Sequence, residues 1–326
     1  MRHLPLLFAT LGLLVSAASC NSVKQTRPPR PHHHTTPTNA IYHWKGIFNP
    51  TDEELDFMAN HDIGRLYIRM FDIATEYDAN SDSMVAVPIA TTRFEQAPPR
   101  SVEVVPVTYI TVDALRKIEG EESSYAHLIV ERIKAMVSYN DCGIIKEIQY
   151  DCDWTASTRH IFFALCRHTC DILHDEGVDL SVTVRLHQMT QEAPMADRGV
   201  LMLYNTGALR NPNTRNSILD VADVEPYLRK CNYPLPLDYA YPTYGWSLLF
   251  RDNRFVRIVS DGDSVELADN ETLRVERATA SEVLDVKHRA ERAFGRPYQS
   301  NIIYHLDINQ LNNYTEDEID QILAGN

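Results

Sequence analysis

The chain has 326 residues, of which 44% are hydrophobic and 23% charged, so its composition is that of a globular protein. Its formal net charge is −14 and its pI is about 5.3. These values argue against a nucleic-acid-binding protein, which needs a basic surface to contact phosphates. Small neutral or cationic ligands and uncharged glycans remain compatible with them.

Residues 1–19 have the features of a targeting segment. A basic start precedes an apolar run from Leu6 to Val15, which is too short to span a bilayer. Small residues then lead to Cys20. This arrangement resembles a bacterial lipoprotein signal peptide, although Ala17 stands where such signals usually carry Leu; an ordinary secretory signal is the alternative. The resemblance implies lipid attachment at Cys20, membrane anchoring, and a periplasmic or cell-surface location in the bacterial envelope.

Residues 20–40 predict an extended tether, because proline and polar residues dominate them. His32, His33 and His34 could contact a metal ion, but within such a segment we interpret them as part of the linker. The folded domain is therefore expected to span residues 41–326.

Strand-like and helix-like segments alternate through this domain. Eight main strands are predicted where short apolar or alternating runs are bounded by turn residues, at 41–44, 64–72, 102–110, 144–153, 179–187, 199–205, 237–241 and 300–307. Residues 84–90 form an additional strand-like segment. Helical spacing is found at 51–61, within 112–139, and at 157–176, 216–230, 278–294 and 315–323. Thr51 and Glu54 form a capping-box pattern at the start of the first helix.

The segments at 255–260 and 272–277 interrupt this alternation. They predict paired strands around the polar turn at 261–263, that is, a β-hairpin inserted between the seventh and eighth main strands. Eight strands alternating with helices or loops indicate a (β/α)8 TIM barrel, a fold of typically ~250 residues whose active site lies at the carboxyl ends of the strands. A doubly wound sheet is the alternative. It normally has a glycine-rich phosphate turn after its first strand, which this sequence lacks.

Asp151 and Asp153 end the fourth main strand. Side chains of a strand alternate, so both carboxylates should point to one side, with Tyr150 and Cys152 on the other. Two adjacent carboxylates are costly unless they share a proton, a cation or a substrate. A solvated strand end, or acids that cap the next helix, is the alternative interpretation.

Other strand ends also carry side chains that could contact a sugar. Aromatic rings can stack on sugar faces, although core packing also explains them. An arginine could equally form a structural ion pair, and a histidine could be a satisfied strand-end residue. The candidates for substrate binding are Trp44, Arg69, Asp72, Trp154, His187, Asn205, Tyr241 and Asp307.

The fourth strand resembles that of the family-18 glycoside hydrolases, the chitinases and their relatives. Their signature is an apolar strand ending Asp-x-Asp-x-Glu, and here Asp151-Cys152-Asp153-Trp154 matches it up to Thr155, which replaces the Glu. The run at 202–205, Met-Leu-Tyr-Asn, is similar to the family's Met-x-Tyr-Asp. The resemblance implies a TIM barrel, a glycan substrate, and catalytic roles for Asp153, Asp151 and Tyr204.

Thr155 leaves the activity open, because the family's Glu protonates the leaving oxygen and a threonine cannot do so at neutral pH. The protein could be a hydrolase in which Asp153 is the acid or orienting carboxylate, Asp151 its pKa partner and Tyr204 a stabiliser. Asp72 or Asp307 would then supply a second carboxyl. Alternatively, it could be a non-catalytic glycan-binding lipoprotein, or a structural lipoprotein with a degenerate barrel.

We predict neither a cofactor nor a metal. Cys166 and Cys170 lie one helical turn apart and are interpreted as packed thiols, because no second pair has metal-ligand spacing. A divalent metal held by Asp151, Asp153 and His187 is the alternative.

Overall fold

The computed structural model describes residues 37–228, 233–259 and 265–325. The predicted signal peptide, its Cys20, the histidine run and most of the tether lie outside the described residues. The first strand begins at Asn39, two residues before the expected start of the domain. Within the described part of the chain, no helix is both long and apolar enough to cross a bilayer.

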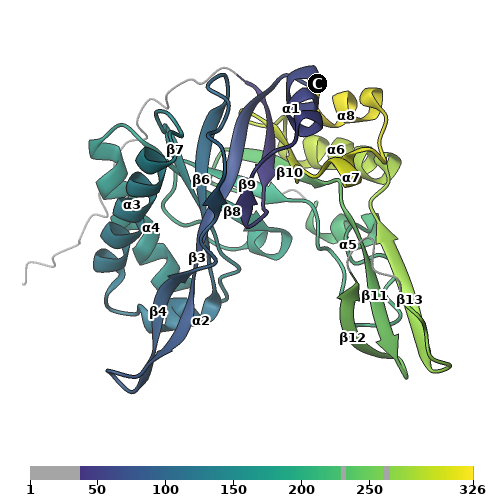
Figure 1. Cartoon of the computed structure of the whole chain (residues 1–326), viewed down its shortest axis with the longest axis horizontal. Helices are drawn as coiled ribbons and strands as arrows, with labels where there is room; N and C mark the ends of the chain where they lie inside the picture. The colour runs from purple at the N-terminus through teal and green to yellow at the C-terminus, as the bar shows by residue number, and fades with distance from the viewer. Residues whose placement is uncertain (1–36, 229–232, 260–264, 326) are drawn as a thin grey trace, which may run out of the picture. The chain divides into compact units, whose positions relative to one another are not determined.

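Eight parallel strands form a closed barrel (Figure 1). In ring order after β1 Asn39–His43 they are β3 Ile63–Asp78, β6 Glu103–Ile110, β7 Glu147–Asp151, β8 Asp179–Arg185, β9 Arg198–Met202, β10 Leu237–Pro242 and β14 Asn301–Tyr304. Strand β1 pairs with both β3 and β14, and these two pairings close the ring. The predicted (β/α)8 barrel is therefore confirmed.

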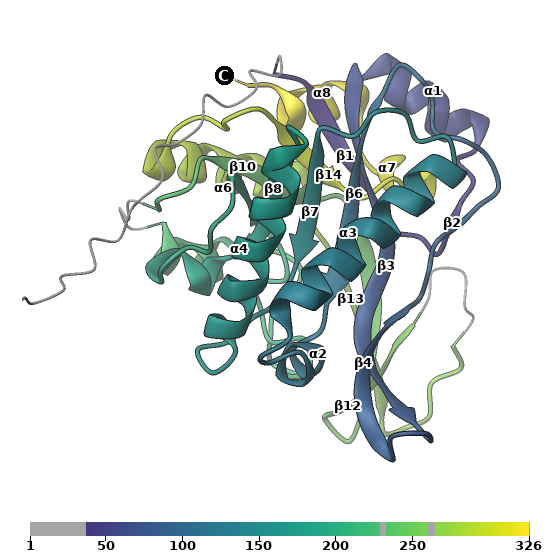
Figure 2. The same cartoon turned by 90° about the vertical axis from the view of Figure 1, so that its left-hand side faces the viewer.

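Helices cover the outside of the barrel unevenly. They are α1 Asp52–Asn60, α2 Val112–Lys117, α3 Glu122–Tyr139, α4 Arg159–Asp175, α5 Val221–Val224, α6 Ala280–Phe294, α7 Ile308–Leu311 and α8 Glu316–Leu323. Helices α3 and α4 pack side by side next to β6 and β7 (Figure 2). The predicted helix at 216–230 is much shorter: only α5 and the 3-10 turn η2 Glu225–Tyr227 form among its described residues.

Strand β3 runs six residues further than the sequence predicts. Beyond Asp72 it pairs antiparallel with β4 Ser83–Ile89, and this hairpin extends past the barrel (Figure 1). Two short strands, β2 Ile47–Phe48 and β5 Arg93–Phe94, pair beside it. The extension leaves the β3–β6 connection without a helix.

The insertion between β10 and β14 is a three-stranded antiparallel sheet. Its strands are β11 Gly245–Arg251, β12 Arg254–Val259 and β13 Glu271–Arg277, in the order β12-β11-β13. The two predicted strands exist, but each pairs with β11 rather than with the other, and the turn at 261–263 lies outside the described residues. A Cβ on Gly245 would lie 2.8 Å from the carbonyl oxygen of Glu276, so only glycine permits this close pairing.

Polar side chains fill the amino end of the barrel interior. Arg198 forms a buried ion pair with Glu147 and donates to Gln299. Arg65 donates to the same Gln299 oxygen at 2.8 Å. The backbone nitrogen of Gln299 in turn donates to the buried Asp238 carboxylate at 2.6 Å. Paired charges therefore fill this end of the barrel interior.

Candidate functional site

Strand β7 sorts its side chains onto two sides as the alternation predicts. Gln149 points into the barrel, where it accepts from the hydroxyl of Tyr42 at 2.6 Å and donates to Ser181 at 3.1 Å. Tyr150 points outward to α4, where its hydroxyl lies 3.0 Å from that of Thr169. Asp151 shares the side of Gln149 and is thereby directed to the interior, at the carboxyl end.

Asp151 is buried and is held by two residues of β8. The hydroxyl of Thr183 donates to its Oδ1 at 2.6 Å, and Arg185 Nη2 donates to the same oxygen at 3.2 Å. Burial raises the pKa of the Asp151 carboxyl, and the nearby charge of Asp153 adds to this; Arg185 and Thr183 lower it without reversing the shift. The group therefore holds a proton more readily than a solvated aspartate.

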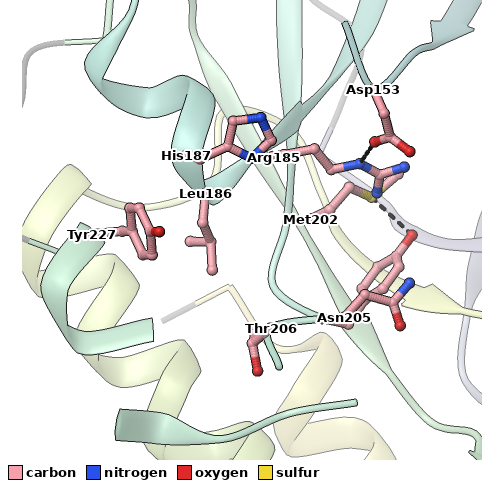
Figure 3. Close-up of a pocket in the computed structure, with 9 residues that line it drawn as sticks. Asp153, Arg185, Leu186, His187, Met202, Asn205, Thr206 and Tyr227 are labelled. Carbon is pink, nitrogen blue, oxygen red and sulfur yellow. Dashed lines mark hydrogen bonds and ion pairs between the residues drawn. The ribbon is translucent and has the colours of Figure 1, made fainter. Parts of the chain in front are cut away.

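Arg185 joins the two carboxylates. Its Nε donates to Asp153 Oδ1 (Figure 3), and because its Nη2 donates to Asp151, one guanidinium contacts both carboxylates. Burial lowers the pKa of Arg185, but the two carboxylates outweigh this and hold it above its ordinary value. The paired acids of the sequence are thus compensated by a protein cation, one of the solutions open to adjacent carboxylates.

A second arginine–carboxylate pair lies on β3. Arg69 Nε donates to Asp72 Oδ1 at 2.7 Å and its Nη2 donates to Oδ2, in a two-pronged contact. Residues three apart face opposite sides of a regular strand, but a bulge between Arg69 and Phe71 shifts the register against β6 and turns both side chains to one side. The Arg69 guanidinium also lies 5.7 Å from the ring centroid of Trp44.

Aromatic rings surround these pairs. The ring centroids of Tyr204 and Tyr304 are 4.8 Å apart, and those of Trp44 and Tyr304 are 5.8 Å apart. The Tyr204 hydroxyl donates to the Met202 sulfur at 2.9 Å, and burial holds the pKa of Tyr204 well above its usual value. Tyr204 is thus a neutral phenol. Burial and the charges of Asp153 and Asp151 raise the pKa of Tyr109 to about 12.

Two adjoining cavities open at this end of the barrel. The carboxylate cavity, of about 250 Å³, is lined by Trp44, Arg69, Asp72, Tyr109, Asp151, Asp153, Arg185, Tyr204, Asn205 and Tyr304. The His187 cavity, of about 270 Å³, is lined by Asp153, Arg185, Leu186, His187, Met202, Tyr204, Asn205, Thr206 and Tyr227. Figure 3 shows the residues of the His187 cavity. The two cavities share Asp153, Arg185, Tyr204 and Asn205, so together they form one continuous lining.

Eight of the predicted site residues line these cavities. Asp151, Asp153, Tyr204, Trp44, Arg69, Asp72 and Asn205 lie in the carboxylate cavity, and His187 lies in the other. Their placement makes them accessible to a ligand, while their roles in binding or catalysis stay predictions.

Three predicted residues lie outside both cavities. Trp154 is 1% exposed and packs against Phe162 and Phe163 of α4. Tyr241 is fully buried on the outer side of β10, close enough to Glu291 of α6 for that charge to raise its pKa further beyond the effect of burial. Asp307 caps α7 by accepting from the backbone of Asn309. Their expected sugar contacts are therefore corrected to core packing for the two aromatics and helix capping for Asp307.

Thr155, at the position of the family's acid, also lies outside the cavities. It is exposed, and its hydroxyl lies 2.9 Å from that of Ser157 and 3.3 Å from that of Thr158. It belongs to the polar turn that precedes α4 and makes no contact with the carboxylates.

Sequence reasoning missed Arg185 and Tyr304. Ser181, Thr183 and Arg185 are polar at every second position between Leu180, Val182 and Val184. This alternation marks Arg185 as an interior residue, although it cannot reveal the partner. Tyr304 is an aromatic residue at the end of the eighth strand. Trp44 was predicted as a site residue because it has the same position at the end of the first strand.

The fold resembles solved structures of glycoside hydrolases. A chitinase from Chromobacterium violaceum has a TM-score of 0.55 at 12% identity, covering 88% of this chain and 98% of the chitinase chain. The spore cortex-lytic enzyme SleL of Bacillus cereus has a TM-score of 0.52 at 14% identity, covering 86% and 75%. A GH18 chitinase from Cycas revoluta, solved with (GlcNAc)3, has a TM-score of 0.52 at 14% identity, covering 87% and 98%.

No protein-family model and no curated protein matches the sequence. The comparisons therefore confirm the distant resemblance through the fold: this chain has a TIM barrel similar to those of family-18 glycoside hydrolases.

Proposed function

We propose that the protein binds a glycan at the carboxyl end of its barrel without hydrolysing it. One observation carries this proposal: each of the three carboxylates lining the cavities is paired with an arginine. Asp72 is paired with Arg69, and both Asp151 and Asp153 are paired with Arg185.

Most glycoside hydrolases use two carboxyl groups, and in the resembling family, where the substrate's own acetamido group acts as nucleophile, one carboxyl must still protonate the leaving oxygen. The position that holds the proton donor in the resembling family is Thr155, whose hydroxyl points into a local turn. The proton donor of the resembling family is therefore absent from its usual position.

The same lining suits the binding of a neutral sugar. Trp44 and Tyr304 offer ring faces of the kind that pack against the apolar face of a pyranose, while Asn205 and the arginines offer donors to hydroxyl groups. The three acids and two arginines nearly balance in charge, which favours an uncharged ligand. Because the Cycas revoluta chitinase was solved with (GlcNAc)3, GlcNAc oligomers are the first ligands to test. A lipid at Cys20 would hold this site at a membrane of the bacterial envelope.

Hydrolysis is the second candidate, because burial raises the pKa of Asp151. A raised pKa is the property that a general acid needs, and Asp151 lines the carboxylate cavity. Asp153, ion-paired with Arg185, would then orient the substrate, and Tyr204 would stabilise the reacting centre.

Calorimetric titration with (GlcNAc)3 and a glycan panel, combined with an assay for released reducing ends, separates the candidates. Binding without release, weakened by Trp44→Ala and unchanged by the matched variant Asp307→Asn, supports the proposal. If reducing ends are released, and Asp153→Asn or Asp151→Asn abolishes this release, the protein is instead a hydrolase. An absence of binding to every glycan would favour a structural lipoprotein.

A further inference from the structure

A second cluster of polar side chains lies at the opposite end of the barrel. Cys170 and His174 are one turn apart on α4, and Asp197 immediately precedes β9. One ligand atom from each, the Cys Sγ, a His ring nitrogen and an Asp oxygen, lies within 4.8 Å of the other two. Among the residues that the structure describes, no other group of three such side chains converges in this way.

Existing contacts orient the three groups. Asp197 Oδ2 accepts from the backbone nitrogen of Leu180 at 2.8 Å, which fixes the carboxylate at the start of β8. His174 Nε2 lies 2.9 Å from Asp197 Oδ2 and 3.1 Å from Oδ1. The Cys170 thiol donates to the carbonyl oxygen of Met195 at 3.4 Å. Each side chain is therefore restrained before any ligand arrives.

The cluster is shielded but accessible from one side. Cys170 is fully buried, whereas the His174 and Asp197 side chains are 12% and 14% exposed. An ion could enter past the latter two and meet the sulfur at the base. Such a position removes the ligands from bulk water without sealing them.

The Asp197 carboxylate supplies a negative charge within the cluster. A bound dication deprotonates a coordinating thiol outright, so the Cys170 sulfur would bind as a thiolate.

The donor set selects the ion. Thiolate, imidazole and carboxylate together suit zinc, which takes these ligands at ~2.0–2.3 Å in tetrahedral geometry. Those bond lengths place neighbouring ligand atoms roughly 3.3–3.6 Å apart. The His174–Asp197 separation of 2.9 Å is a few tenths of an ångström shorter, and the Cys170 sulfur lies within 4.8 Å of both other ligand atoms.

We propose that Cys170, His174 and Asp197 bind a zinc ion, with water as the fourth ligand. Binding releases the thiol proton to solvent and replaces the contact between His174 and Asp197 with two metal–ligand bonds. The ion fastens α4 to the strand junction at the amino end of the barrel, so it stabilises the fold and takes no part in glycan binding.

The test uses the full chain after dialysis against a chelator. His32, His33 and His34 are first replaced with Ala, because a histidine run can bind zinc by itself. Zinc is titrated by calorimetry, and Co²⁺ serves as a spectroscopic probe because a thiolate ligand gives it a sulfur-to-metal charge-transfer band. We expect one ion per chain, this band, and a melting temperature several degrees higher at zinc about 100-fold above its Kd.

Single variants locate the ion. Cys170→Ser should abolish the charge-transfer band, whereas Cys166→Ser, a matched buried thiol one turn earlier on α4, should leave it. Asp197→Asn keeps an acceptor for Leu180 and should lower the affinity at least about 10–100-fold, the loss seen when even an outer partner of a ligand is removed. If Cys170→Ser does not fold, Asp197→Asn and His174→Gln still decide the question. Absence of one-to-one binding, or unchanged affinity in these variants, would overturn the proposal.

Discussion

Replacing Arg185 with Met should destabilise the fold at neutral pH, because Asp151 would stay buried without its counter-charge. The Asp151 side chain is 6% exposed and that of Arg185 is 20% exposed. Removing one partner of a buried ion pair costs about 3–5 kcal/mol. The Asp153 side chain is 47% exposed, so solvent screening limits its share to about 0–1 kcal/mol. We therefore expect the free energy of unfolding at pH 7 to fall by about 3–6 kcal/mol.

The loss should become smaller as the pH falls. Burial already raises the pKa of Asp151 in the folded protein, and removing Arg185 raises it further. Such a carboxyl binds its proton more tightly in the folded state than in the unfolded state, where its pKa is about 3.9. Its destabilising effect is absent below about pH 3.9 and becomes complete as the pH rises through the folded pKa. The difference between wild type and Arg185→Met is thus largest at neutral pH.

Urea unfolding of both proteins at pH 7 and at about pH 4.5 measures this difference by linear extrapolation. Arg185→Lys is the matched control. The lysine keeps the positive charge but cannot donate to Asp151 and Asp153 as the guanidinium does. The free energy of unfolding should therefore fall less in Arg185→Lys than in Arg185→Met. Adding Asp151→Asn to Arg185→Met should restore part of the stability, because no buried charge then remains unpaired at this position. Equal stability of wild type and Arg185→Met at pH 7, or a loss that does not depend on pH, would refute the reasoning.

Three further substitutions separate packing from binding. Trp154→Ala should lower the free energy of unfolding by about 3–5 kcal/mol, because it opens a cavity beneath α4; a loss below 1 kcal/mol in urea unfolding would contradict this. Trp44→Ala should weaken glycan binding in calorimetry and change stability less than Trp154→Ala does, because Trp44 is only half-buried. Glu147→Gln should cost about 3–5 kcal/mol by leaving Arg198 buried without its partner, with glycan binding unchanged in the protein that stays folded.

The alternation of side chains along β7 was the most informative local pattern. It correctly placed Asp151 and Asp153 on one side and Tyr150 and Cys152 on the other. The same pattern also places Trp154 with Tyr150, on the side that faces α4. Its burial beneath α4 therefore follows from the alternation that located the acids, and the expectation of a sugar contact was inconsistent with it.

The bulge in β3 could not be inferred from the sequence. Arg69 and Asp72 are three residues apart and would face opposite sides of a regular strand. Only the register of β3 against β6 reveals the extra residue that brings them together. The order of the insertion sheet could not be inferred either, because β11 lies between the two strands that the spacing predicted to pair.

The sequence by itself determined the series of eight strands, the alternation of side chains along the fourth strand, and the location of the paired acids at the carboxyl end of β7. These features depend on local sequence patterns, because the side chains of a strand alternate between its two faces and the spacing of apolar residues reflects this alternation. Only the tertiary structure decided that Arg185 forms ion pairs with Asp151 and Asp153 and that Arg69 forms one with Asp72. It also decided that Asp197 lies beside Cys170 and His174. These contacts join residues from different elements, and they form only when closure of the barrel fixes the register of each strand against the next.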